Sequence, residues 1–186
     1  QHSDYSIGDG YCTLDEIIKR GKELGYKAVA LTDHGTTTGL YAFYQKCKKA
    51  GIKPILGMEG YFCPEPEMKS GENAHIILLA KDMNGLRNLY RLSSIGAKQF
   101  YKKPRIGIKD LRKYHKGLIC TTACIAGFFN RYPDSVEEIA NIFGDDFYME
   151  VQPHDFKEQQ MYNERVWDYA MSHDYRVIVT NDAHYA

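Results

Sequence analysis

The sequence lacks an excess of either charge and any long apolar run. Its 186 residues include 24 lysines and arginines against 24 aspartates and glutamates. This balance excludes a strong overall field for nucleic acid, so DNA binding would need a local basic patch or a partner domain. No apolar stretch approaches the roughly 20 residues of a membrane span, and no signal peptide is recognisable. We therefore expect a cytoplasmic protein without a membrane partner.

The sequence also lacks a cysteine pattern of the kind that forms disulfides. The five cysteines are an odd number and include no Cys-x-x-Cys pair, which argues against a disulfide framework and favours a reducing compartment. The hydrophobic content of 44% is enough for one sizeable core, so residues 1–186 should form one domain. Because the sequence begins without a methionine and stops just after a candidate site, we expect it to be part of a longer chain.

Metal-competent side chains follow several predicted strands. The apolar residues 28–31 lead through Thr32 into Asp33, His34 and Gly35. The same order recurs where Glu59, Cys124, Asp182 and His184 each come after a short apolar run. The loops at strand ends are the places where β/α barrels build their active sites. The sequence therefore predicts a metal site at one edge of a sheet.

Strand-like and helix-like segments alternate along the chain. Apolar spacing of 3.6 predicts helices over residues 14–24, 40–50, 84–92, 108–115, 135–143 and 155–173. Residues 1–12 should be the end of a first strand and a Gly-rich loop, and further strands are expected over residues 28–32, 54–59, 76–80, 118–123, 147–151 and 176–180. Capping boxes should begin the helices after Thr13 and Ser135, and Asn84 should cap a third. Seven alternating units predict an α/β fold with a parallel sheet, either a closed β/α barrel or an open sheet.

Eight side chains are candidate metal ligands: His2, Asp9, His34, Glu59, His75, Cys124, Asp182 and His184. Imidazole nitrogens and carboxylate oxygens suit zinc, manganese or iron. A catalytic zinc takes about three protein ligands, so eight candidates imply two or three ions. Asp33 is expected to orient a ligand rather than bind metal. His115 and His173 are read as structural, and His154 is either a supporting residue or part of a turn.

These residues fall into motifs that resemble a known family. His2-Ser3-x-Tyr5-Ser6 with Asp9-Gly10, Thr32-Asp33-His34-Gly35, Gly57-x-Glu59, and Thr180-Asn181-Asp182-x-His184 are similar to the motifs of the PHP (polymerase and histidinol phosphatase) domain. His75 and Cys124 fit the same pattern. The segments 46–57 and 103–105 resemble the version found in bacterial replicative DNA polymerases. The resemblance covers essentially the whole chain.

The resemblance implies a distorted seven-stranded (β/α)7 barrel with a trinuclear metal site and, in many relatives, metal-dependent 3′–5′ exonuclease activity. It implies that all eight candidates bind Zn²⁺ or Mn²⁺ ions, two or three in number, and that Asp9, His34, Glu59 and Asp182 are catalytic. Glu59 or Asp182 is expected to bridge two ions. The family's first motif is His-x-His, and only its second histidine, His2, is present; the first would lie one position before Gln1.

The implied partners are a DNA 3′ end, other domains of a polymerase chain and other replisome subunits. Arg105, with Lys102 or Lys103, is expected to bind a DNA phosphate, because residues 101–105 form the densest basic segment. Two alternatives stay open at this point. The domain is either a metal-stabilised structural module without catalysis or a phosphomonoesterase of the histidinol-phosphate type.

Overall fold

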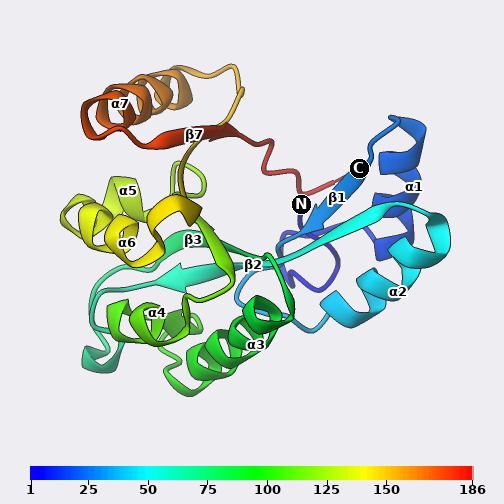
Figure 1. Ribbon diagram of the computed structural model, residues 1–186, viewed down its shortest axis with the longest axis horizontal. Helices are drawn as coiled ribbons and strands as arrows, with labels where there is room; N and C mark the ends of the chain where they lie inside the picture. The colour runs from blue at the N-terminus through cyan, green and yellow to red at the C-terminus, as the bar shows by residue number, and fades with distance from the viewer. Residues whose placement is uncertain (186) are drawn as a thin grey trace.

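The computed structural model describes residues 1–185, which form an α/β fold around one curled seven-stranded sheet (Figure 1). The strands are β1 (Ala28–Leu31), β2 (Lys53–Phe62), β3 (Ala74–Ala80), β4 (Arg105–Ile106), β5 (Leu118–Thr121), β6 (Phe147–Val151) and β7 (Arg176–Val179). The α-helices are α1 (Leu14–Glu23), α2 (Leu40–Ala50), α3 (Met83–Lys98), α4 (Ile108–Tyr114), α5 (Phe128–Arg131), α6 (Val136–Phe143) and α7 (Lys157–His173). Short 3₁₀ turns are η1 (Pro66–Met68), η2 (Pro133–Ser135) and η3 (Gly144–Asp146).

The strand order is β1-β2-β3-β5-β6-β7, with β4 paired to β2. Parallel pairing, as predicted, joins β1 to β2, β2 to β4, β5 to β6 and β6 to β7. The expectation of an entirely parallel sheet is wrong, because β3 runs antiparallel to both β2 and β5. A parallel neighbour needs a long crossover, usually helical, and the loop of residues 63–73 that joins β2 to β3 holds only η1. The result is a curled half-barrel with β1 and β7 at its edges.

The predicted strand within residues 1–12 is absent, since this segment consists of turns and coil. Its backbone nevertheless connects the two edges of the sheet. Thr32 N donates to Gln1 O at 3.0 Å, and His2 N donates to Ala183 O at 3.0 Å. The two chain ends therefore lie side by side between β1 and β7 (Figure 1).

A bend in β2 gives the sheet its curl. The first half of β2 pairs with β1 up to Leu56, and the second half pairs with β3 from Gly57 onward. A Cβ atom on Gly57 would lie 2.5 Å from Leu79 Cδ2 and 2.8 Å from Leu78 O, so only glycine permits this close approach. Glu59 was predicted to follow a strand; it lies inside β2, two residues beyond the bend.

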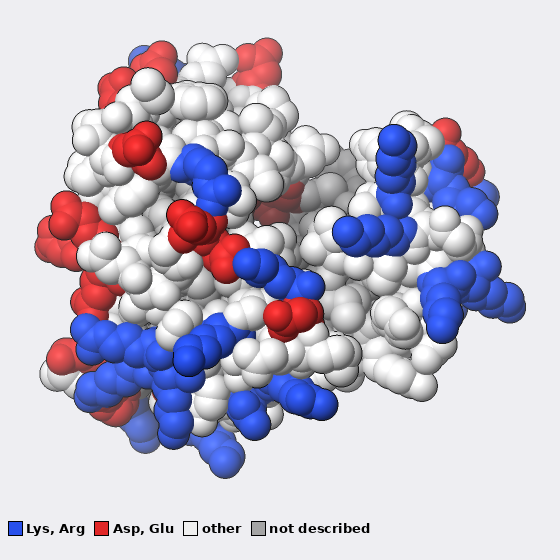
Figure 2. Space-filling view, in the orientation of Figure 1, with Lys and Arg blue, Asp and Glu red and all other residues white. Residues whose placement is uncertain are grey.

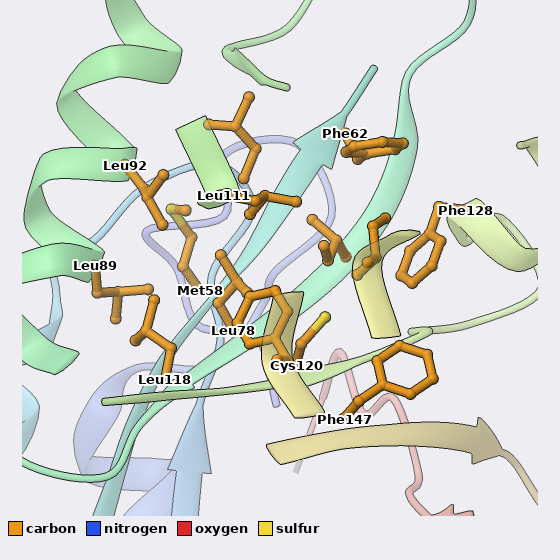
Figure 3. Packing of buried hydrophobic residues seen from close by; sticks show 14 of the residues in the cluster. Met58, Phe62, Leu78, Leu89, Leu92, Leu111, Leu118, Cys120, Phe128 and Phe147 are labelled. Carbon is orange, nitrogen blue, oxygen red and sulfur yellow. The ribbon is translucent and has the colours of Figure 1, made fainter. Parts of the chain in front are cut away.

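The main hydrophobic core lies between the sheet and helices α3, α4 and α6 (Figure 3). Buried side chains from the strands face side chains from helices α3, α4 and α5: Met58, Phe62, Leu78, Leu89, Leu92, Leu111, Leu118, Cys120, Phe128 and Phe147. Burial of apolar area on this scale is the dominant favourable term in folding. The core therefore fixes the second half of β2, and Glu59 with it.

The helix caps are predicted with mixed success. The capping box of Thr13 and Glu16 is present at the start of α1. Asp82, and not Asn84, caps α3, since its side chain accepts from Gly85 N at 2.8 Å. Ser135 makes no side-chain capping bond, because its backbone is already helical at the end of η2.

Arg105 holds the loop of residues 63–73 against the sheet. Its side chain is fully buried, Nη1 donates to Ser70 O at 2.6 Å, and Nη2 donates to Pro66 O at 2.6 Å. The guanidinium also lies 4.8 Å from the centre of the Tyr101 ring. A side chain placed in this way is not open to DNA, so the expectation that Arg105 binds a phosphate does not fit the structure.

Replacing Arg105 should destabilise the fold. The variant Arg105→Gln leaves the carbonyls of Pro66 and Ser70 without their charged donor. Hydrogen bonds to charged groups are each worth about 1.5–3 kcal/mol. We expect urea denaturation to show a loss of about 3 kcal/mol and limited proteolysis to cut within residues 63–73. Lys102→Gln removes an exposed charge nearby and should change neither readout. An Arg105→Gln protein as stable as the parent would contradict this assignment.

Candidate metal centre

All eight candidate ligands lie in one connected cluster where the chain ends meet β1 and β2. His2 Nε2 is 2.9 Å from Glu59 Oε2 and 3.2 Å from Asp182 Oδ1. The His2 ring stacks on the ring of His34, with centroids 4.1 Å apart, and on the ring of His184, at 4.3 Å. Four of the other candidates thus contact the His2 ring.

The remaining three join the cluster through His34 and Glu59. His34 Nε2 lies 3.1 Å from Asp9 Oδ2, and His34 Nδ1 lies 3.4 Å from Glu59 Oε2. His75 Nδ1 lies 2.7 Å from Glu59 Oε1 and 3.3 Å from Cys124 Sγ. Glu59 therefore faces one group of histidines with each carboxylate oxygen.

Backbone hydrogen bonds between distant segments hold the cluster together. Glu59 N donates to Asp33 O at 3.1 Å, and Gly35 N donates to Glu59 O at 2.8 Å, so His34 and Glu59 are neighbours across a parallel bridge. On the other side, Tyr11 N donates to His184 O at 3.2 Å. The N-terminal loop, the end of β1, the middle of β2 and the segment after β7 are thereby fixed to one another.

Two site segments adopt strained backbone. Ala123, beside Cys124, has φ 60°, and Asp182 has φ 44°. Non-glycine residues rarely occupy this left-handed region, and such strain concentrates at functional sites. In both segments the turn carries the chain from a strand into the cluster. The strain is a cost that the surrounding contacts must offset.

The electrostatics of the cluster favour charged partners in contact. Burial favours the neutral form of Glu59, but the close contacts with His2 and His75 prevail and lower the pKa of this carboxyl below its usual range. Burial likewise lowers the pKa of His2, but hydrogen bonding to Asp182 and contact with Glu59 prevail and raise it to about 9. For His34 the effect of burial prevails, so the pKa of this imidazole is lowered. Without metal, His2 is a buried cation at neutral pH.

The donor set fits divalent metal ions. Three groups each bring their ligand atoms within 4.8 Å of one another: His2, His34 and His184; His34, Glu59 and His75; and His2, Glu59 and Asp182. At their common centre, the buried atoms His34 Nδ1 and Glu59 Oε2 have no hydrogen bond of regular geometry. Buried polar atoms are normally hydrogen-bonded, so unpaired donors and acceptors at a shared point fit an ion. Nitrogen and carboxylate ligands suit zinc or manganese.

Asp33 is absent from these three groups and instead binds the loop that carries His2. Its carboxylate accepts from Ser3 N at 2.7 Å, from Ser3 Oγ and from Ser6 Oγ at 2.8 Å. Ser6 Oγ in turn accepts from His34 N at 3.1 Å and lies 3.4 Å from His2 Nδ1. These bonds fix the loop that carries His2. The two serines were not singled out individually, although the His-Ser-x-Tyr-Ser motif contains both.

Lys103 lies at the rim of the cluster, in contrast to the buried Arg105. Its exposed ammonium is 5.1 Å from the centre of the Tyr61 ring. The same ring lies 5.9 Å from His34 and 5.5 Å from His75. Tyr61 therefore connects the basic segment to the ligands, a role that sequence reasoning missed. Its position two residues after Glu59 in one strand was the available signal, because such residues share a face.

Glu150 is a second residue that the sequence did not reveal. Its carboxylate is buried beneath the cluster and accepts from Thr121 Oγ1, Thr180 Oγ1 and, at 3.2 Å, Gln152 Nε2. Burial raises its pKa. His115, His154 and His173 lie outside the cluster: their ring nitrogens or rings contact Arg112 O, Phe156 and Tyr169. The structural reading of His115 and His173 therefore fits.

The structure is thus an α/β half-barrel that gathers histidines and carboxylates beside its chain ends. Two solved structures share this fold. A candidate metal-dependent phosphoesterase from Bifidobacterium adolescentis matches 98% of this chain and 85% of its own with a TM-score of 0.68 at 16% identity. An amidohydrolase from Chromobacterium violaceum matches 99% and 86% with a TM-score of 0.60 at 15% identity. The chain belongs to the PHP domain family, whose model matches residues 1–154.

Curated relatives place this family member more narrowly. The chain is 42% identical to a DNA polymerase III subunit alpha from Aquifex aeolicus over 99% of this chain, and 42% identical to that of Borreliella burgdorferi over 99%. It is 35% identical to the Thermus aquaticus subunit over 100%. The chain spans less than a fifth of these relatives, 18%, 17% and 17% respectively. No helix within residues 1–185 is long and apolar enough to cross a membrane.

Metal binding should release a proton from His2. With a pKa of about 9, this imidazole is protonated at pH 7 in the metal-free protein, and a histidine must be neutral to bind metal. Calorimetry of Zn²⁺ binding at pH 7, in two buffers of different ionisation enthalpy, should therefore show proton release that falls by about one in His2→Asn. His115→Gln is the control and should behave as the parent. Equal proton release from His2→Asn would be evidence against this assignment.

Proposed function

We propose that this chain is the PHP domain of a bacterial replicative DNA polymerase and that it hydrolyses phosphodiesters at a DNA 3′ end with two or three Zn²⁺ or Mn²⁺ ions. The observation that supports the proposal is the convergence of eight metal-competent side chains, among which the buried atoms His34 Nδ1 and Glu59 Oε2 make no hydrogen bond of regular geometry. The similarity to polymerase subunits along the whole chain supports DNA as the substrate.

The two oxygens of Glu59 suit it to serve two ions. Oε1 faces His75, and Oε2 faces His2 and His34. Asp182 adds a carboxylate on the His2 side, and Asp9 adds one beyond His34. Bound divalent ions make water a stronger acid at neutral pH and neutralise the charge of a phosphate. The protein's own part is to hold these three carboxylates and three imidazoles in a fixed arrangement around the buried Glu59.

Lys103 is the group that we assign to the phosphate. It is exposed, forms no ion pair with an acid within residues 1–185, and stands over Tyr61 at the rim of the cluster. A flexible ammonium there can meet a phosphate oxygen as a point charge. Arg105 has no such role in this proposal.

The wider partners follow from the relatives and remain part of the proposal. The curated relatives are more than five times as long as this chain, so we infer contacts with other domains of a polymerase chain and with other replisome subunits. Polymerisation itself would belong to those other domains. The net charge of zero fits a domain that relies on a local basic surface to bind DNA.

The central test is hydrolysis of 3′-labelled single-stranded DNA in the presence of Mn²⁺ or Zn²⁺. Asp9→Asn should lower the rate of nucleotide release by about 100-fold or more, while leaving the unfolding midpoint unchanged. The reason is that Asp9 is 54% exposed and touches only His34 in the cluster. Asp134→Asn, an exposed acid on η2, is the matched control and should keep full activity.

Two other outcomes identify the alternatives. A metal-loaded protein that releases no nucleotide, but unfolds more readily when the metal is removed, is a structural module. Turnover of histidinol phosphate without action on DNA identifies a phosphomonoesterase. Either result would rule out the proposed function.

Lys103→Gln should weaken substrate binding more than turnover. An exposed charged contact is worth up to about 1 kcal/mol, so we expect KM for DNA to rise about fivefold with kcat little changed. Lys102→Gln is the control, since the Lys102 ammonium lies 5.4 Å from the Tyr101 ring and not over Tyr61. Steady-state kinetics on a 3′-labelled oligonucleotide would measure both. Equal effects of the two substitutions would contradict a specific role for Lys103.

A further inference from the structure

We propose that the outer face of α3 binds the single-stranded DNA that leads into the metal centre. This inference rests on the proposed function, because it assigns the part of the substrate upstream of the 3′ end. The face is defined by Arg87, Arg91, Ser94 and Lys98, which are all exposed. Their spacing of four, three and four residues places them on one stripe of the helix. At 1.5 Å per residue the stripe is about 16 Å long.

The cations of this face are not neutralised. Helix α3 contains no aspartate or glutamate in residues 83–98. Within residues 1–185, Arg87, Arg91 and Lys98 form no ion pair with an acid; Arg91 instead donates to Asn88 Oδ1 and lies over the Tyr114 ring. Figure 2 shows basic side chains gathered over α3 and α4, and a second group over α1 and α2. In that second group Lys19, Arg20 and Lys46 pair with acids.

Helix α3 ends next to the rim of the metal centre, because Lys98, the last residue of the stripe, comes five residues before Lys103. The helix is fixed there by its buried side, which faces away from the stripe. Gly96 of α3 packs against Pro104, since a Cβ atom there would lie 3.3 Å from Pro104 O. Pro104 also reaches Gly35, the residue after His34: a Cβ atom on Gly35 would lie 2.5 Å from Pro104 Cγ. Lys103, next to Pro104, stands over Tyr61 and so beside His34 and His75. The end of α3 that carries Lys98 is therefore held beside the ligands by a short series of direct contacts.

Exposed aromatic rings accompany the cations. Tyr90 is 38% exposed on α3, and Phe100, just past its end, is 59% exposed. Proteins that bind single strands combine a basic track for the backbone with aromatic side chains on which bases stack. An acidic protein would need only the cations of this face, whereas single-stranded DNA would use both the cations and the aromatic rings. The two features together therefore favour single-stranded DNA.

The test removes the three cations and compares two substrates. The variant Arg87→Gln, Arg91→Gln, Lys98→Gln and the parent chain are titrated with a fluorescent 20-nucleotide single strand at several salt concentrations. Each phosphate contact with a single strand contributes about 0.7 to the slope of log affinity against log salt, so the slope should fall by about 2. If the variant and the parent bind equally at 1 M salt, the affinity of the variant at 0.1 M salt should be lower by on the order of 100-fold. Phe100→Ala should weaken binding about fivefold or more through lost stacking.

The control variant is Lys22→Gln, Lys48→Gln, Lys49→Gln, which removes three exposed, unpaired cations from α1 and α2. It should keep the parent slope. Hydrolysis gives a second readout: the α3 variant should lose kcat/KM on the 20-nucleotide strand and keep it on a dinucleotide. An unchanged slope, equal losses in both triple variants, or equal losses on both substrates would overturn the inference. A chain that hydrolyses neither substrate refutes the proposed function, while the salt slope still decides this inference.

Discussion

The structure depends on keeping one buried carboxylate, Glu59, in contact with histidines. The side chain is 1% exposed, and an isolated charge at such depth would be very costly. His2 and His75 offset that cost by contact at 2.9 Å and 2.7 Å. Breaking such a buried pair leaves an uncompensated charge, which typically destabilises by 3–5 kcal/mol. The positions of the N-terminal loop and of β3 are therefore tied to one side chain in β2.

Two departures from a regular β/α barrel, the bend in β2 and the antiparallel direction of β3, help to bring Glu59 and His75 together. The bend at Gly57 turns the second half of β2 toward β3, and this turn carries Glu59 inward. The antiparallel β3 then places His75 directly across from Tyr61 in the pairing register. In a parallel β3, a residue at the start of the strand would lie beside the start of β2, away from Glu59. The antiparallel reversal thus brings His75 within two residues of Glu59 in the pairing register.

The sequence predicts which candidate ligands come together better than it predicts the direction of the strands. Side chains such as His34 and Asp182 follow apolar runs, and motif spacing carries their chemistry even when strand direction is unknown. Strand direction depends on which segments meet in space, and the periodicity of the sequence does not reveal it. The η1 loop and the two-residue β4 are too short to show a periodic pattern at all. Burial of Arg105 was likewise invisible, because its partners are backbone carbonyls of residues 66 and 70, which any sequence could supply. A basic run in sequence therefore separated into a structural Arg105 and an exposed Lys103.

That separation explains how one segment serves both the fold and the rim of the site. Arg105 lies in β4 with its guanidinium turned into the loop of residues 63–73, whereas Lys103, two residues earlier, lies exposed over Tyr61. Pro104 between them fits into the space left by Gly96 on α3 and Gly35 beside His34. Because both neighbours are glycines, the segment approaches α3 and the ligand loop at once. A side chain at either glycine would push Pro104 away and move Lys103 from the metal centre. The close packing at Pro104 therefore sets the distance between the basic surface and the ligands.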